Sequence, residues 1–183
     1  MFLDIGAGIL LSIFVGTIFD INISPLWIIS GIVFALLPDV DMISYFLKTK
    51  ILKKPVDDHR SFTHYPVIYI PLIVAAYFTV GAPYSLLLAL CVYFHFIHDT
   101  VWLGWGISWF WPVASRKFKF FPDKHGKISS QFLMTWTKDE EIEIFRKYHN
   151  PSWVRDFYFR PNIVAYVEYS VFIIAFLVLV KLF

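Results

Sequence analysis

Residues 61–98 read SFTHYPVIYI PLIVAAYFTV GAPYSLLLAL CVYFHFIH, without a single Asp, Glu, Lys or Arg. A membrane helix needs about 20 apolar residues, so this stretch is too long for one helix and suits two. Gly81-Ala82-Pro83 interrupts it in the middle, as glycine and proline do at turns. The stretch therefore predicts a hairpin of two apolar helices, over residues 65–80 and 84–100.

The composition of the whole chain agrees with this hairpin. Of the 183 residues, 58% are hydrophobic and only 16% are charged, whereas an average soluble domain carries about 25% charged residues. The mean hydropathy is +0.63. One cysteine argues against a disulfide scaffold, and the length leaves room for one domain. The composition predicts a single membrane domain over residues 1–183.

Three further apolar segments lie outside the hairpin, over residues 3–20, 25–38 and 163–182. Ser24 followed by Pro25 is typical of a helix N-cap with proline at the first helical position. Pro38 is expected to end the second helix, because proline interrupts a helix interior. The fold class predicted is all-α: a polytopic helical membrane protein with about five transmembrane helices.

The basic residues predict the orientation of these helices. With five helices, segments 39–64 and 101–162 fall on one side of the membrane, and they hold every Lys and Arg except Lys181. The positive-inside rule makes that side cytoplasmic. We therefore expect a multi-pass protein of the inner membrane, with its N-terminus in the cytoplasm and its C-terminus outside.

Segment 101–162 is the sizeable part outside the predicted helices, and we expect it to lie on the cytoplasmic interface. Trp102, Trp105 and Trp109 have the spacing of one helical face, and Trp is enriched at headgroup level. Thr137 and Glu140 form a capping-box pattern before a predicted helix over 138–149.

Three polar motifs lie at the predicted cytoplasmic ends of helices two, three and four. Because helices three and four form an antiparallel hairpin, their histidines are expected at the same depth in the membrane as the end of helix two. The motifs are Pro38-Asp39-Val40-Asp41, His59-Arg60-Ser61-Phe62-Thr63-His64 and His95-Phe96-Ile97-His98-Asp99.

These motifs have the chemistry of a metal site. His95 and Asp99 lie one helical turn apart on one face, and carboxylates at helix C-termini are unfavourable unless a cation compensates them. Imidazole and carboxylate groups are typical ligands of Zn²⁺, Mn²⁺ or Fe²⁺. The predicted metal ligands are Asp39, His59, His64, His95, His98 and Asp99.

Two further residues of the motifs have candidate catalytic roles. Asp41 is a candidate ligand or general base, and Arg60 suits a phosphate oxygen because its planar fork binds two oxygens at once. A simpler interpretation stays open for single motifs. Asp39 and Asp41 alone are compatible with a solvated helix end, and a histidine at the interface can snorkel to water.

In the same order, these motifs resemble those of the YdjM-like family of inner-membrane-associated, metal-dependent hydrolases. That family has P-D-x-D-H, then H-R-x-x-T-H, then H-x-x-x-D followed by a glycine and a W-P-x-x-x-R-like stretch. Here the last two features are Gly106 and Trp111-Pro112-Val113-Ala114-Ser115-Arg116, and the resemblance covers roughly residues 1–120. Met42 stands where the family usually has His, and Asp4 is the candidate substitute for a family His near the N-terminus.

The resemblance implies a metal-dependent hydrolase, with zinc as the expected metal and Mn²⁺ or Fe²⁺ as alternatives. A bound metal lowers the pKa of its water to about 7. The depth of the site makes a lipid or lipid-linked phosphoester the expected substrate class, with membrane lipids as partners and no sign of nucleic-acid binding. Three alternatives stay open: a histidine-box di-iron oxidase, a non-enzymatic membrane adaptor, and a transporter, which the apolar mid-helix positions disfavour.

Overall fold

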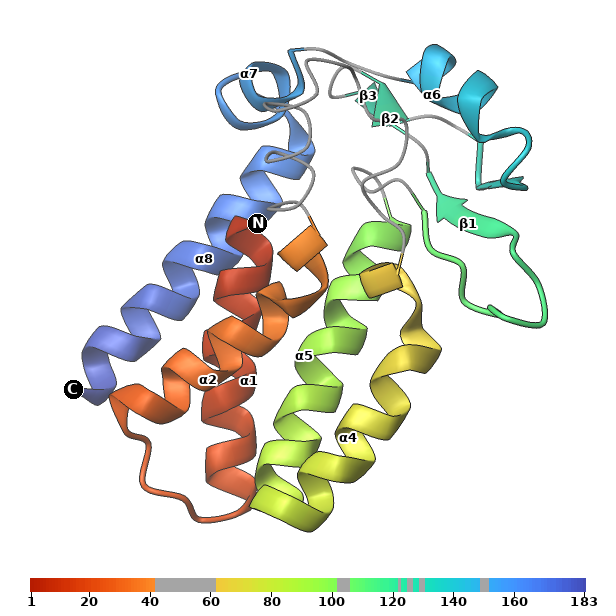
Figure 1. The fold of residues 1–183 in the computed structure, drawn as a ribbon. Coiled ribbons are helices and arrows are strands. Elements are labelled where there is room, and N and C mark those ends of the chain that lie inside the picture. The colour runs from red at the N-terminus through yellow and green to blue at the C-terminus, as the bar shows by residue number, and fades with distance from the viewer. Residues whose placement is uncertain (42–61, 102–105, 122, 125–126, 129–130, 149–151) are drawn as a thin grey trace, which may run out of the picture. The chain divides into compact units, whose positions relative to one another are not determined.

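The computed structural model describes residues 1–41, 62–101, 106–121, 123–124, 127–128, 131–148 and 152–183. These residues are mostly helical (Figure 1). The helices are α1 (Phe2–Ile18), α2 (Pro25–Leu36), η1 (Leu37–Asp39), η2 (Phe62–His64), α4 (Pro66–Val80), α5 (Ala82–Thr100), α6 (Glu141–Tyr148), α7 (Trp153–Tyr158) and α8 (Ile163–Leu182). The chain divides into two compact units: unit 1 comprises Met1–Leu37, Ile68–His95 and Tyr166–Phe183, and unit 2 comprises Pro38–Val67 and Phe96–Ala165.

Unit 1 is a bundle of apolar helices with α1 and α2 at its centre. On one side, Val15 of α1 and Trp27 of α2 form a buried cluster with Leu87 of α5. On the other side, Ile9 of α1 packs with Ala175 of α8. The central pair therefore holds both α5 and α8, as the ribbon of Figure 1 shows.

The two central helices approach closely at a pair of glycines. A Cβ built on Gly31 would lie 1.9 Å from Ser12 Oγ and 2.5 Å from the carbonyl oxygen of Gly8. A Cβ built on Gly8 would lie 2.7 Å from the carbonyl oxygen of Gly31. The backbones touch here, as they do where small residues line a contact between membrane helices.

The predicted apolar helices are confirmed, and each end lies within two residues of its predicted place. Ser24 accepts a hydrogen bond from the backbone N–H of Trp27, 3.3 Å away, and Pro25 is the first residue of α2. The last turn before Asp39 is a 3₁₀ turn that contains Pro38. Gly81, with φ of +93°, separates α4 from α5.

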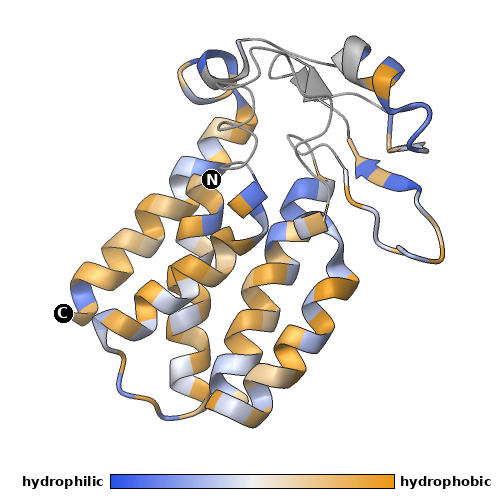
Figure 2. Ribbon diagram, viewed as in Figure 1, coloured by the Kyte–Doolittle hydropathy of each residue, from blue (hydrophilic) through white to orange (hydrophobic). Residues whose placement is uncertain are grey.

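The prediction of five transmembrane helices is only partly supported. In the part of the chain that the structure describes, α8 is the one helix that is long and apolar enough to cross a membrane. The other apolar helices, Phe2–Ile18, Pro25–Asp39 and Pro66–Val80, are shorter. Their hydrophobic colouring in Figure 2 is similar to that of α8. Apolar residues exposed on α8, such as Phe176 and Leu177, fit a helix that faces lipid.

Unit 2 contains short strands, which the all-α prediction missed. The strands β1 (Lys117–Phe120) and β4 (Leu133–Trp136) pair antiparallel, as do β2 (Asp123–Lys124) and β3 (Lys127–Ile128). Lys117 and Lys119 are buried, while Phe118 between them is half-buried. Lys117 forms an ion pair with Glu141 at the start of α6, which explains how a buried lysine is accommodated at this position.

The predicted helix with Trp102, Trp105 and Trp109 on one face is not found at Trp109. Trp102 and Trp105 lie outside the described residues, and Trp109 lies in a turn. Ile107 exchanges two backbone hydrogen bonds with Phe118 of β1, and Gly106 has φ of +73°. Backbone pairing with β1 therefore takes the place of a helix at this point of the chain.

The capping box before α6 is confirmed in one direction. The carboxylate of Glu140 accepts hydrogen bonds from the backbone N–H and the hydroxyl of Thr137, at 2.7 and 3.1 Å. The two hydrogen bonds lower the pKa of Glu140 below its ordinary value, and the bond from the backbone of Thr137 has the larger effect. α6 then begins at Glu141 rather than at residue 138.

Asn162 joins the end of α7 to the beginning of α8. Its side-chain oxygen accepts from the backbone N–H of Ala165, 2.9 Å away, which caps α8. Its amide nitrogen donates to the carbonyl oxygens of Asp156, Phe157 and Arg160, at 3.2, 3.0 and 2.8 Å. One side chain therefore satisfies backbone groups on both sides of the turn.

Replacing Asn162 by Ala is expected to lower the free energy of unfolding by about 1–2 kcal/mol, since both the cap and the turn lose their partner. Thermal unfolding of the purified protein in detergent measures the change. Asn162→Ser is the matched control, because serine can still cap a helix but has no amide to donate. Asn162→Ser should recover part of the lost stability. Equal unfolding midpoints for the wild type and both variants would contradict the stabilising role of Asn162.

Candidate metal centre

His64 is a buried histidine of unit 2 with three carboxylates around it. It ends the 3₁₀ turn η2, two residues before Pro66 begins α4, and its side chain is 3% exposed. Proline fixes the entry into α4, and the turn before it directs the imidazole inward. The position of His64 in the fold therefore follows from the same local sequence that starts the helix.

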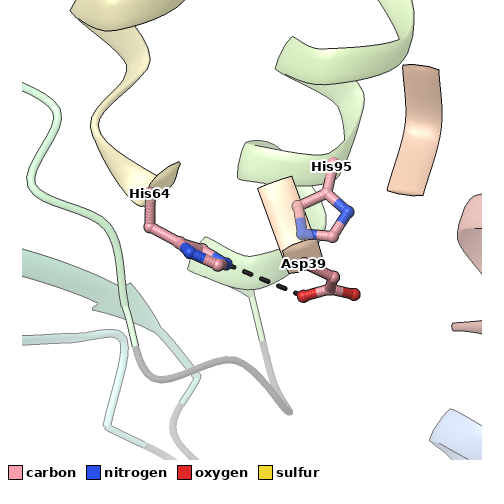
Figure 3. Close-up of side chains that lie close together, drawn as sticks. All are labelled: Asp39, His64 and His95. Carbon is pink, nitrogen blue, oxygen red and sulfur yellow. Dashed lines mark ion pairs between the residues drawn. The ribbon is translucent and has the colours of Figure 1, made fainter. Parts of the chain in front are cut away.

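Three carboxylates surround the ring of His64. Asp41 Oδ2 lies 3.0 Å from Nδ1. On the other side of the ring, Asp99 Oδ2 lies 3.5 Å and Asp39 Oδ1 3.7 Å from Nε2. The dashed line in Figure 3 marks the ion pair between His64 Nε2 and Asp39 Oδ1. Three acids and one imidazole thus share one small volume.

The two nitrogens of His64 have different roles in this arrangement. A carboxylate accepts hydrogen bonds, so the short contact with Asp41 places the ring hydrogen on Nδ1. Thr63 Oγ1 lies 3.3 Å from the same nitrogen. In the neutral ring, the lone pair of Nε2 faces Asp39 and Asp99, which are also electron-pair donors. Three donors that face one another attract a cation and otherwise repel.

The spacing of these donors fits one metal ion. Bonds from zinc to nitrogen and oxygen are about 2.0–2.2 Å long, so two ligand atoms of a tetrahedral ion are about 3.3–3.6 Å apart. The two distances from His64 Nε2, 3.5 and 3.7 Å, are close to that range. The side chain of Asp39 is 23% exposed while that of Asp99 is 7% exposed, so the site is most open at Asp39.

His95 lies in unit 1 and has its own acidic neighbour. It is 1% exposed, and its Nδ1 lies 2.9 Å from the carbonyl oxygen of Ala35 and 3.3 Å from Asp4 Oδ1. His95 is on α5, one helical turn before Asp99, so both side chains are on the same face of that helix. The side chains drawn in Figure 3, Asp39 and His64 of unit 2 and His95 of unit 1, all carry atoms that can ligate a metal ion.

Of the other predicted site residues, the structure describes only His98. His98 is half-buried on α5, next to Asp99. The predicted ligand His59 and the predicted phosphate-binding residue Arg60 lie outside the described residues. Glu168, for which a role was not predicted, is 1% exposed, and its Oε2 lies 3.5 Å from the amino group of Met1.

Aromatic side chains lie beside His64 in unit 2. The rings of Tyr65 and Trp111 are stacked, with centroids 4.6 Å apart and an interplanar angle of 5°. Phe62, two residues before His64, is 64% exposed, and Phe110, next to Trp111, is 60% exposed. In the sequence, Trp111 stands out only as part of the Trp111–Arg116 motif, and nothing in its separation from Tyr65 indicates that the two rings stack. Trp and Tyr are the aromatic residues enriched at the membrane–water interface.

Buried histidines and carboxylates are costly on apolar helices, which makes these residues candidate functional positions. The comparison with family models gives the particular family. The chain belongs to the YdjM inner membrane protein family, whose model matches residues 4–182. No curated protein and no solved structure matches the chain significantly.

Proposed function

We propose that the protein is a membrane-bound, metal-dependent hydrolase with its site at the cytoplasmic face of the inner membrane. The observation that carries the proposal is the environment of His64, whose Nε2 faces two carboxylates while Asp41 occupies the side of Nδ1. Asp39, His64 and Asp99 would hold the metal. His95 would add a ligand from the preceding turn of α5, since it shares a helix face with Asp99.

The protein's own groups have separate tasks in this proposal. A divalent metal such as Zn²⁺ supplies Lewis acidity, which makes water a nucleophile near neutral pH and polarises the bond to be cleaved. Asp41 orients His64 through Nδ1, as carboxylates commonly do for metal-binding histidines. This role differs from the ligand or general base expected from the sequence. Asp39, the most exposed of the three acids, is the natural side for substrate to enter.

The substrate class proposed is a lipid or lipid-linked phosphoester. Support comes from Tyr65, which follows the site residue His64, and from Trp111, which stacks on Tyr65, because both are residue types common at the headgroup layer. Membership of an inner membrane protein family also supports it. Arg60, proposed from the sequence alone, would bind two phosphate oxygens through its guanidinium group. His59 and His98 are further ligand candidates on the same sequence grounds.

Metal analysis of the purified protein separates this function from its competitors. Stoichiometric zinc or manganese supports the hydrolase, two iron atoms per chain favour the di-iron oxidase, and no bound metal favours the adaptor. The activity assay is release of phosphate or headgroup from mixed liposomes with added Zn²⁺ or Mn²⁺. Metal-loaded protein that releases nothing from any lipid phosphate would contradict the hydrolase.

The proposed topology has five membrane helices, with the N-terminus in the cytoplasm and the C-terminus outside. Its support is the placement of every Lys and Arg except Lys181 in segments 39–64 and 101–162. A reporter enzyme that is active only outside the cytoplasm should therefore be active when fused after Phe183 and inactive when inserted within 138–140. Activity of a cytoplasm-specific reporter at the C-terminus would overturn this topology.

A further inference from the structure

His95 is held by two acceptors at the same ring nitrogen. The carbonyl oxygen of Ala35 lies 2.9 Å from Nδ1 and Asp4 Oδ1 lies 3.3 Å from it. A backbone carbonyl oxygen can only accept a hydrogen bond. The hydrogen of the neutral ring is therefore on Nδ1, shared between the carbonyl and the carboxylate, and the lone pair is on Nε2.

The position of Asp4 is unusual for a carboxylate. It is 1% exposed within an apolar helix, and burying a charged group is costly unless other groups compensate it. Three features offset that cost. Asp4 lies in the first turn of α1, where the helix dipole favours negative charge, its Oδ2 lies 3.0 Å from the amino group of Met1, and its Oδ1 faces His95. A buried acid held this way can fix the ring beside it.

We propose that Asp4 is a positioning residue for His95. The proposal rests on the function proposed above, in which His95 contributes to the metal site. Asp4 and Ala35 together hold the hydrogen on Nδ1, so that Nε2 is the ligand atom, and the negative charge of Asp4 makes that nitrogen a stronger electron-pair donor. Asp4 thus acts through the histidine rather than as a metal ligand in its own right.

The first test needs no metal. Protein labelled with ¹⁵N-histidine gives the tautomer of His95 by NMR, with His95→Gln used to assign its signals. Hydrogen on Nδ1, with a proton signal that moves upfield in Asp4→Asn, is the expected result. Asp20→Asn, a carboxylate change in the exposed turn after α1, should leave the signal in place. A wild-type protein with the hydrogen on Nε2, or an unmoved signal in Asp4→Asn, would overturn the proposal.

The second test measures the effect on Zn²⁺ affinity. Loss of an outer carboxylate of this kind typically costs about 10- to 100-fold in metal affinity, so Asp4→Asn should weaken binding by that factor in the wild-type background. The same change should have no further effect in a His95→Gln background, because the residue through which Asp4 acts is gone. Equal losses in both backgrounds would mean that Asp4 does not act through His95.

The two tests fail for different reasons. Wild-type protein that binds no Zn²⁺ contradicts the proposed function, while the shift of the His95 proton signal between wild type and Asp4→Asn, measured without metal, still decides whether Asp4 holds the ring. If Asp4→Asn does not fold, Asp4→Glu takes its place, because it keeps the charge and moves the carboxylate. The proton signal should then shift, and an unmoved signal would overturn the proposal.

Discussion

Replacing His64 by Ala is expected to abolish stoichiometric metal binding and the release of phosphate from lipid. The imidazole supplies the nitrogen that faces Asp39 and Asp99 at 3.7 and 3.5 Å, and its removal leaves two acids with no nitrogen donor between them. We expect metal affinity to fall by more than about 100-fold, since even outer partners of metal ligands are worth 10- to 100-fold. Metal content and lipid hydrolysis of the purified variant measure the loss.

Asp99→Asn is the companion change, because it keeps the size of the side chain and removes its charge. Asp139→Asn, at an exposed position before α6, is the matched control and should behave as wild type. If both His64→Ala and Asp99→Asn keep their full metal content, the proposal of a metal centre at these residues is wrong. Circular dichroism and gel filtration in detergent check that each variant is folded.

Gly31→Ala is expected to destabilise the protein by about 1–3 kcal/mol, the usual cost of forcing an extra group into a well-packed contact. The new Cβ would lie 1.9 Å from Ser12 Oγ and 2.5 Å from the carbonyl oxygen of Gly8, so α1 and α2 must separate. The sign of the effect is informative, because glycine to alanine within an unobstructed helix stabilises by up to about 1 kcal/mol.

Thermal unfolding in detergent measures this change, and Ser30→Ala is the matched control. Ser30 is the neighbouring residue on α2, and its hydroxyl donates only to the exposed carbonyl of Leu26, so its loss should change the midpoint little. Gly31→Ala that unfolds at or above the wild-type temperature would contradict the close approach. The variant should also disturb His95, because Ala35, one helical turn after Gly31, supplies the carbonyl that holds its ring.

The apolar helices could be predicted from the sequence because their signals are local. Charge-free runs give the lengths, and Ser24, Pro25 and Gly81 mark where helices begin and end. The strands of unit 2 were missed for a different reason. The alternation from Lys117 to Phe120 is typical of a strand, but the buried positions are the lysines, and burial of Lys117 depends on a distant partner, Glu141.

The candidate site was predictable as a group of residues but not as a geometry. The hairpin of α4 and α5 and the end of α2 were expected to gather Asp39, His64 and Asp99, and the contacts around His64 agree with that expectation. Which nitrogen of a ring faces which carboxylate depends on side-chain orientation, for which spacing gives no signal. The separate positions of Asp41 and Asp4, each beside an Nδ1, could therefore only be seen in the structure.

The short segment after α2 has a consequence for how the sequence can vary. Asp39 and Asp41 approach opposite nitrogens of one ring, and Val40 between them is 48% exposed. The chemistry thus depends on the number of residues in this segment and hardly on the side chain at position 40. Substitutions of Val40 should therefore have little effect. An insertion or deletion beside it would turn one carboxylate away from His64. Related proteins that keep this centre should keep the length of the segment while the residue at position 40 varies.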